Sequence, residues 1–320
     1  MIDNTRHRRR TARLLAETVL VFALIAAATL WADAGTASWS AAVIPILLFA
    51  QGIWIDRLYI VAHEGVHGKL LPFHRVVNDI VTSLLLLPIA APLTIYRKIH
   101  FFHHGSNRRD VMTAALDSFS IKGNITSVRR LYYRAVWIFY VFMGGFFLHS
   151  LVTILLFLLV PTRTLRKIDP VFNGWRPSMR LRAWGEFAFG LGLHGTIAAT
   201  LGFDQWLLLL GWPLVAFAWV WSLLLYIYHY DTSVGTEVRY NVRSLPRHPF
   251  ASWLFLNFNE HATHHYDPSI PWHLLPEHRR PLPERFASNE NVRSIAGAIL
   301  QQLRGPRLVI GKPMQEEERQ

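Results

Sequence analysis

Five stretches without a charged side chain constrain this chain more than any other feature of its sequence. They cover residues 18–31, 41–55, 135–160, 187–203 and 206–228. Apolar segments of this kind are typical of helices that lie in a bilayer, where a helix satisfies its own backbone hydrogen bonds. Only 17% of the residues are charged, against about a quarter in a soluble domain. We therefore predict an all-α integral membrane protein.

The basic residues predict how this chain is oriented. Five arginines lie between residues 6 and 13, whereas residues 32–40 contain no Lys or Arg. By the positive-inside rule the N-terminus is cytosolic, and the first two apolar stretches form a hairpin. We interpret the first stretch as a retained signal-anchor helix, although Ala32-Asp33-Ala34 resembles a cleavage site. Stretches 187–203 and 206–228 predict a second hairpin, which gives about four transmembrane helices.

Two further segments are predicted to be irregular. Pro88 and Pro92 interrupt the apolar run 80–95, which indicates a re-entrant or interfacial segment. Stretch 135–160 carries Gly144-Gly145 at its middle and basic residues on both flanks, which favours a hairpin over one tilted span. We expect one domain, 1–320, divided into 11–62 (first hairpin), 63–134 (two histidine clusters), 135–160, 186–228 (last hairpin), 229–285 (cytosolic cap with a third cluster) and 286–320 (a partly disordered tail).

Three histidine clusters carry the chemistry. The first has the pattern HxxxH, and the second and third have the pattern HxxHH: His63 and His67; His100, His103 and His104; His261, His264 and His265. Positions i, i+3 and i+4 share one face of a helix, so these eight imidazoles could serve two first-row metal ions. The chain has no cysteine, which excludes thiolate zinc sites and iron–sulfur clusters. His149, His194 and His278 lie outside the clusters and are interpreted as structural.

In this order and spacing, the clusters resemble those of the membrane fatty acid desaturase superfamily, the histidine-box di-iron desaturases and hydroxylases. The resemblance extends over residues 41–277 and includes Asn78-Asp79 and Asp267-Pro268. The family's metal ligands fall on the eight clustered histidines, and a further family ligand falls on His229. Leu225 stands where some relatives have an Asn, and Asn257 could replace it. Weaker candidates for support of the ligands are Glu64, Asp110 and Glu260.

The resemblance implies an O2-dependent oxidoreductase with two iron ions that attacks an unactivated C–H bond of a fatty acyl or lipid chain. A fatty acid desaturase is the first expectation. Lipid or carotenoid hydroxylases and ketolases, and enzymes that form terminal alkenes or alkynes, share the scaffold. Two electrons per turnover would come from a ferredoxin, a rubredoxin or a cytochrome b5-type protein. Basic residues near the clusters either attract such a donor or reflect topology alone: Lys69, Arg75, Arg97, Lys98, Arg108 and Arg109.

Three other functions are weighed against this one. His63-Glu64-Gly65-Val66-His67 also satisfies H-E-x-x-H, the motif of zinc proteases, but a protease would not need the two HxxHH clusters. A metal transporter would place its ligands near the bilayer midplane rather than at helix ends. The net charge of +12 is scattered between apolar stretches, so it favours anionic lipid or topology over nucleic acid. We expect a bacterial inner-membrane protein whose site faces the cytosol.

The predicted topology can be tested with single cysteines, because the chain has none of its own. Ser106→Cys and Ser269→Cys should be protected from an impermeant thiol reagent added to intact cells, and Ala34→Cys and Asp204→Cys should react. Labelling of position 106 or 269 from outside would contradict a shared cytosolic site.

Overall fold

The computed structural model describes residues 4–35, 39–111 and 115–311, and within them it is predominantly helical. Three segments are long and apolar enough to cross a bilayer: α1 (Asn4–Ala34), α2 (Ser40–Val66) and the continuous run of α9 (Phe203–Trp206), a π-helical turn η3 (Leu207–Gly211) and α10 (Trp212–Leu225). A fourth candidate combines α5 (Ser127–Phe142) and α6 (Gly145–Leu159). The chain is therefore an all-α membrane protein, as the sequence predicts.

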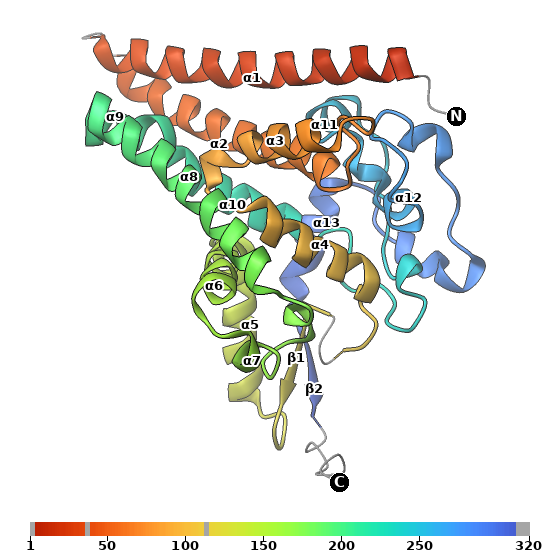
Figure 1. Cartoon of the computed structure of the whole chain (residues 1–320). Coiled ribbons are helices and arrows are strands. Elements are labelled where there is room, and N and C mark those ends of the chain that lie inside the picture. The colour runs from red at the N-terminus through yellow and green to blue at the C-terminus, as the bar shows by residue number, and fades with distance from the viewer. Residues whose placement is uncertain (1–3, 36–38, 112–114, 312–320) are drawn as a thin grey trace.

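The bundle is layered around α2 and α10, which pack closely against each other. Figure 1 shows α1 at one edge of the molecule, α5 and α6 toward the opposite edge, and α8 (Pro177–Leu201) between them. α8 begins ten residues before the predicted stretch 187–203. α8 has 25 residues but is not among the candidate membrane spans found in the described residues. Its first half carries the charged residues Arg180, Arg182 and Glu186.

Both irregular segments turn where the sequence places a helix breaker. The helix before Gly144 and the helix after it differ in direction by 85°, and Gly144 has a φ of 80°, which glycine adopts without strain. Stretch 135–160 therefore breaks at the predicted glycine pair, at a right angle rather than as an antiparallel hairpin. Run 80–95 contains the end of α3 (Arg75–Leu85), a 3-10 turn η1 (Leu87–Ile89) with Pro88, and the start of α4 (Leu93–Ser106) after Pro92.

Short helices form a cap around the C-terminal ends of α2, α4 and α10. Before α8 lie α7 (Thr162–Leu165) and η2 (Pro170–Phe172). After α10 come η4 (Val238–Tyr240), α11 (Pro249–Leu254), η5 (Phe258–Glu260), α12 (His261–Tyr266), η6 (Leu275–His278), η7 (Glu284–Glu290), α13 (Ile295–Gln301) and η8 (Gln302–Arg304). These elements hold the third histidine cluster against the first two.

Residues 286–311, which form most of the predicted tail 286–320, are folded. Strand β1 (Ser118–Ile121) pairs in parallel with β2 (Arg307–Ile310). The indole N–H of Trp137 donates to the Gln302 carbonyl at 2.8 Å, and the Tyr230 hydroxyl donates to the Gly305 carbonyl at 2.6 Å. These bonds satisfy buried polar groups, so they fix the segment to α5 and to the turn after α10. Residues 312–320 lie outside the described residues.

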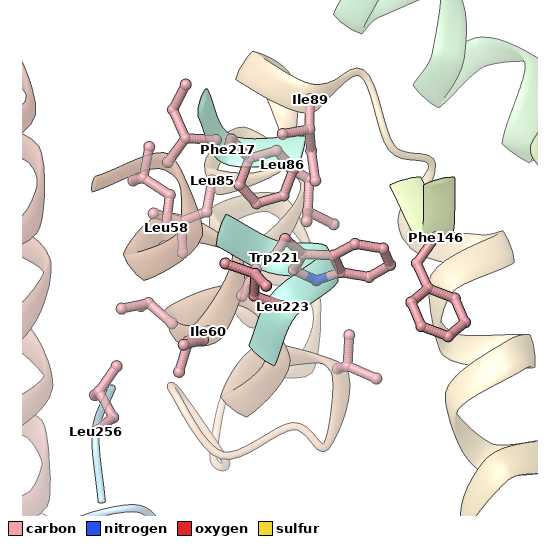
Figure 2. Close-up of a cluster of buried hydrophobic side chains, with 14 of the residues drawn as sticks. Leu58, Ile60, Leu85, Leu86, Ile89, Phe146, Phe217, Trp221, Leu223 and Leu256 are labelled. Carbon is pink, nitrogen blue, oxygen red and sulfur yellow. The ribbon is translucent and has the colours of Figure 1, made fainter. Parts of the chain in front are cut away.

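The largest apolar core lies where α2, η1 and α10 meet. Figure 2 shows Phe217 and Trp221 of α10 among Leu58, Ile60 and Leu86. A second cluster packs Phe157 of α6 against Phe172 and Trp175. Because most of this apolar packing surrounds α2 and α4, it holds the two helices that carry the first two histidine clusters.

Gly65 allows α2 and α3 to pack closely beside the first histidine cluster. The Asn78 side-chain amide donates to the Gly65 carbonyl at 2.8 Å, and a Cβ at Gly65 would lie 1.9 Å from Thr82 Oγ1. Gly65→Ala should therefore lower the free energy of unfolding by about 1–3 kcal/mol, the usual cost of overpacking. Thermal unfolding in detergent measures this loss.

Gly105→Ala is the matched control for this substitution, because a Cβ at Gly105 meets no atom within 4 Å and the residue lies beside the second histidine cluster in α4. It should leave stability unchanged or raise it slightly, since Ala favours helix. Equal melting temperatures for the Gly65→Ala and wild-type proteins would show that α2 and α3 are not held in close contact.

Candidate metal centre

The histidines lie at helix ends that meet in the cap. His63 is in the last turn of α2 and His67 is the residue that ends it. His100, His103 and His104 occupy the last turns of α4, and the third cluster occupies α12. His229 lies four residues after the end of α10, in a turn where its backbone N–H donates to the Tyr226 carbonyl at 3.0 Å. Four separate segments therefore deliver imidazoles to one place.

All nine histidines that the sequence singles out fall into two groups, which we name by size. The five-histidine group contains His63, His67, His100, His104 and His264; the four-histidine group contains His103, His229, His261 and His265. Within each group, one nitrogen from every ring lies within 4.8 Å of the corresponding nitrogen of every other ring. The two groups adjoin, because the rings of His104 and His265 stack with centroids 4.3 Å apart.

Each HxxHH cluster divides its side chains between the two groups in the same way. In the second cluster, His100 and His104 join the five-histidine group and His103 joins the other. In the third cluster, His261 and His265 join the four-histidine group and His264 joins the other. Positions i and i+4 are thus paired and position i+3 crosses over, so each HxxHH helix bridges two sites.

The nitrogen atoms are spaced as the ligands of one ion would be. His67 Nε2 lies 2.7 Å from His100 Nε2, and His104 Nε2 lies 3.0 Å from His100 Nε2 and 3.1 Å from His264 Nε2. In the other group His229 Nε2 lies 3.0 Å from His261 Nε2. Imidazole nitrogens at about 2.1 Å from a metal stand roughly 3 Å apart in octahedral coordination. The donor set, neutral nitrogen without thiolate, suits first-row metals.

Several of these imidazole nitrogens are buried and have no hydrogen-bond partner among the described residues. They include both ring nitrogens of His63 and His265, and Nδ1 of His104, His229 and His261. Leaving such a group unpaired costs roughly 1–3 kcal/mol each. A metal ion bound to the free lone pairs would offset part of that cost, so the residues fit a two-metal centre.

The weaker candidates are held by contacts of other kinds. Glu64 Oε2 accepts the Trp272 backbone N–H at 3.1 Å, and its Oε1 lies 3.9 Å from His63 Nδ1, too far for a hydrogen bond. Asn257 donates to the Trp272 carbonyl. Glu260 accepts from Asn259 and Arg279. Asp110, in the turn after α4, belongs to neither histidine group. Support of the ligands by these four residues stays a prediction.

Burial keeps the imidazoles neutral. It lowers the pKa of His67 to about 3 and that of His103 to about 4, from 6.5 in both cases. It also lowers the pKa of His261 and His265 well below that value, with a further contribution from neighbouring imidazoles. A neutral ring is the form that binds metal, so no proton has to leave these side chains at neutral pH.

The histidines interpreted as structural lie apart from both groups. His194 lies between the Pro88 carbonyl and the indole N–H of Trp206, each 3.1 Å from a ring nitrogen. His278 is exposed in η6. His149 has a different setting from the one expected: it lies 3.4 Å from the Tyr140 hydroxyl and lines a cavity that reaches the metal candidates.

That cavity has a volume of about 650 Å³ and runs between α2, α4, α6 and α10. Five of the nine histidines line it: His63, His100, His103, His229 and His261. Most of its wall is aliphatic or aromatic, with Ile95, Phe147 and Phe217 among the lining residues. An apolar cavity that is lined in part by clustered imidazoles suits a hydrocarbon chain beside a metal centre.

A family model described as fatty acid desaturase matches residues 37–294, which is most of the chain. This chain belongs to the fatty acid desaturase family. No curated protein matches it. The family is one of desaturase- and hydroxylase-type oxidoreductases that act on lipid and take electrons from a partner, so the zinc-protease interpretation of His63-Glu64 is set aside.

Two features of the site escaped the sequence interpretation. Asp56, which lines the cavity, follows directly after the apolar stretch 41–55, and an ionisable residue at such a place is a signal of function. Arg108 was placed on the basic outer face, but it is fully buried, where it bonds Asp117 at 2.6 Å and the Tyr226 hydroxyl at 2.9 Å. The sequence alone does not show that Arg108 is buried through its pairing with Asp117, nine residues further along the chain.

The lowered pKa values predict an acid-sensitive fold for the metal-free desaturase. An imidazole whose folded pKa lies below 6.5 favours folding above that pH, and the contribution falls as the pH decreases toward the folded pKa. Below about pH 6.5 each such ring should cost about 1.4 kcal/mol per pH unit. Unfolding of the metal-free protein between about pH 7.5 and 5 measures the slope.

His103→Ala should reduce this slope, whereas substitution of the exposed His278 by Ala should not change it. A stability profile that is flat across this pH range would mean that the imidazoles are not buried in the neutral form.

Proposed function

We propose that this desaturase binds two iron ions, one in each histidine group, and uses O2 and two electrons per turnover to act on an unactivated C–H bond of a fatty acyl or lipid chain. The observation that supports it is the joining of two all-imidazole groups to one apolar cavity. Desaturation of a fatty acyl chain is the reaction proposed. Hydroxylation, ketolation or formation of a terminal alkene or alkyne would use the same ligands.

The nine histidines would hold the two ions, and the bound pair would supply the activation of O2. The chain's own contribution is positional. Ile95, Phe147 and Phe217 would keep the substrate chain extended and exclude water from the reacting carbon. His63 and His100 belong to the five-histidine group and His103 and His229 to the other, so a chain in this cavity would pass both groups.

The proposed electron donor is a ferredoxin, a rubredoxin or a cytochrome b5-type protein that docks on the cap. Of the basic residues near the clusters, Arg75 and Arg109 are exposed. Arg97 is paired with Asp79 at 2.6 Å, and Lys98 donates to the Asn173 carbonyl. The basic surface that could attract an acidic donor is therefore smaller than the sequence suggests, because Arg97, Lys98 and Arg108 already bond to other groups of this chain.

The proposed location is the bacterial inner membrane, with both histidine groups on the cytosolic side. The chain would act as one desaturase-like domain, since the third cluster completes both groups begun by the first two. The scattered arginines around the apolar stretches support this orientation.

Iron content and product formation, measured on one preparation, test the proposal. Iron-replete wild type should carry close to two iron ions per chain and should change the lipid profile of the cells that express it. His264→Ala should lose both properties, because no spare imidazole lies nearby in the five-histidine group. One zinc ion and no iron in the wild type would contradict the proposal.

His229→Ala separates a ligand from a structural residue within the same measurement. Because His229 belongs to the four-histidine group, the His229→Ala protein should lose iron and product formation together. A purely structural His would cost only about 1 kcal/mol of stability. His194→Ala is the control, because it removes a half-buried imidazole that makes hydrogen bonds but lies outside both groups. This variant should keep two iron ions.

A further inference from the structure

The cavity contains one carboxyl group that nothing in the fold explains. Asp56 of α2 is 2% exposed and lines the cavity, and its Oδ2 has no hydrogen-bond partner among the described residues. Its neighbour Arg57 does not pair with it. The Arg57 guanidinium bonds Glu17 at 2.8 Å and the carbonyls of Trp253 and Leu254, so it links α1, α2 and α11 instead.

Two donors in the same cavity lack a well-formed hydrogen bond. The hydroxyl of Tyr96, on α4, and the indole N–H of Trp221, on α10, are buried near the Tyr59 side chain, but neither makes a hydrogen bond of good geometry to a described residue. Tyr59, one turn after Asp56 on α2, connects them: its ring stacks on Tyr96 at 5.0 Å and meets Trp221 edge-on at 5.7 Å. Three of the helices that line the cavity, α2, α4 and α10, thus each contribute one polar group without a well-formed hydrogen bond.

The energetic cost of this arrangement is considerable. A carboxyl group removed from water without a partner is strongly disfavoured, and each unpaired donor adds roughly 1–3 kcal/mol. Apolar residues of similar size would be cheaper at all three positions. Polar groups inside a membrane helix, aimed into a cavity, indicate a ligand that satisfies them.

The polar cluster lies on the membrane side of the metal candidates. Asp56 precedes His63 by seven residues, roughly 10 Å along α2. Tyr96 precedes His100 by one turn, roughly 6 Å, and Trp221 lies in the last turns of α10, which ends four residues before His229. A chain that passes the histidines therefore extends on toward this cluster within the same cavity.

We propose that Asp56, Tyr96 and Trp221 bind a hydroxyl group carried by the substrate chain. A hydroxyl donates one hydrogen bond and accepts two, so it can donate to an oxygen of the Asp56 carboxyl group and accept from the phenol or the indole. A keto oxygen accepts only, and a methylene satisfies none of the three groups. This inference rests on the proposed function and narrows its substrate to hydroxylated acyl or lipid chains.

Binding of stearic acid and of hydroxystearic acids with the hydroxyl at successive carbons tests the inference on purified, iron-loaded protein in detergent. In the wild type, at least one positional isomer should compete with radiolabelled stearic acid about tenfold better than stearic acid itself, the effect of one or two net hydrogen bonds. Asp56→Leu should keep stearic acid binding and remove the preference. Ile60→Val, which alters the cavity wall without a polar group, should keep it.

Thermal unfolding gives a second measurement that does not depend on activity. Asp56→Leu should raise the melting temperature of the metal-free protein, because it removes an unpaired buried carboxyl group. A lower melting temperature would assign Asp56 a structural role and overturn the inference. So would equal affinity of the wild type for stearic acid and every hydroxystearic isomer, with the proposed function intact. Failure of all these acids to bind would overturn the acyl-chain function as well.

Discussion

Nine neutral imidazoles that are buried or half-buried together impose a condition on the structure around them. Each ring has one N–H and one lone pair, and the Nε2 atoms of six of the rings lie 2.7 to 3.1 Å apart in four pairs. Only some of these close pairs can be hydrogen bonds between neutral rings, because each ring has a single N–H to donate, so some lone pairs face each other without a proton between them. A cation between them resolves the conflict. The cap therefore has to be rigid enough to hold helix ends from α2, α4 and α12 in one place, and the third cluster has to be docked by its own contacts rather than by metal alone.

The docking is carried by bonds that sequence patterns do not reveal. Arg57 links α2 to the carbonyls of Trp253 and Leu254, just before the third cluster, and Glu64 accepts the Trp272 N–H just after it. Both residues belong to α2, which also carries His63 and His67. Because one helix supplies two ligands and anchors both sides of the third cluster, the distance between the clusters is set before any metal binds.

Periodicity and spacing predicted the parts of this structure that depend on short stretches of chain. The membrane helices follow from uncharged runs, the break at Gly144 from paired glycines, and the nine candidate ligands from helical spacing and, for His229, from family position. The division of each HxxHH cluster between two groups depends on how α4 and α12 cross, which is a tertiary property. The 85° bend, the folded residues 286–311 and the burial of Arg108 depend on distant partners in the same way.

Asp56 and Arg57 are adjacent ionisable residues in one membrane helix, and their different surroundings separate structure from function. Successive residues on a helix point about 100° apart, so one faces α1 and α11 while the other faces the cavity. Arg57 is surrounded by a carboxylate and two carbonyls, and its charge stabilises the helix packing. Among the described residues, the Oδ2 of Asp56 has no such partner, and the polar groups of Tyr96 and Trp221 have only the nearby Tyr59 side chain, with which they form no hydrogen bond of good geometry. The fold supplies Arg57 with three partners, although its Nε stays unpaired, whereas no described residue bonds the Oδ2 of Asp56. That it leaves three polar groups open along one cavity wall is best explained by a partner that arrives with the substrate.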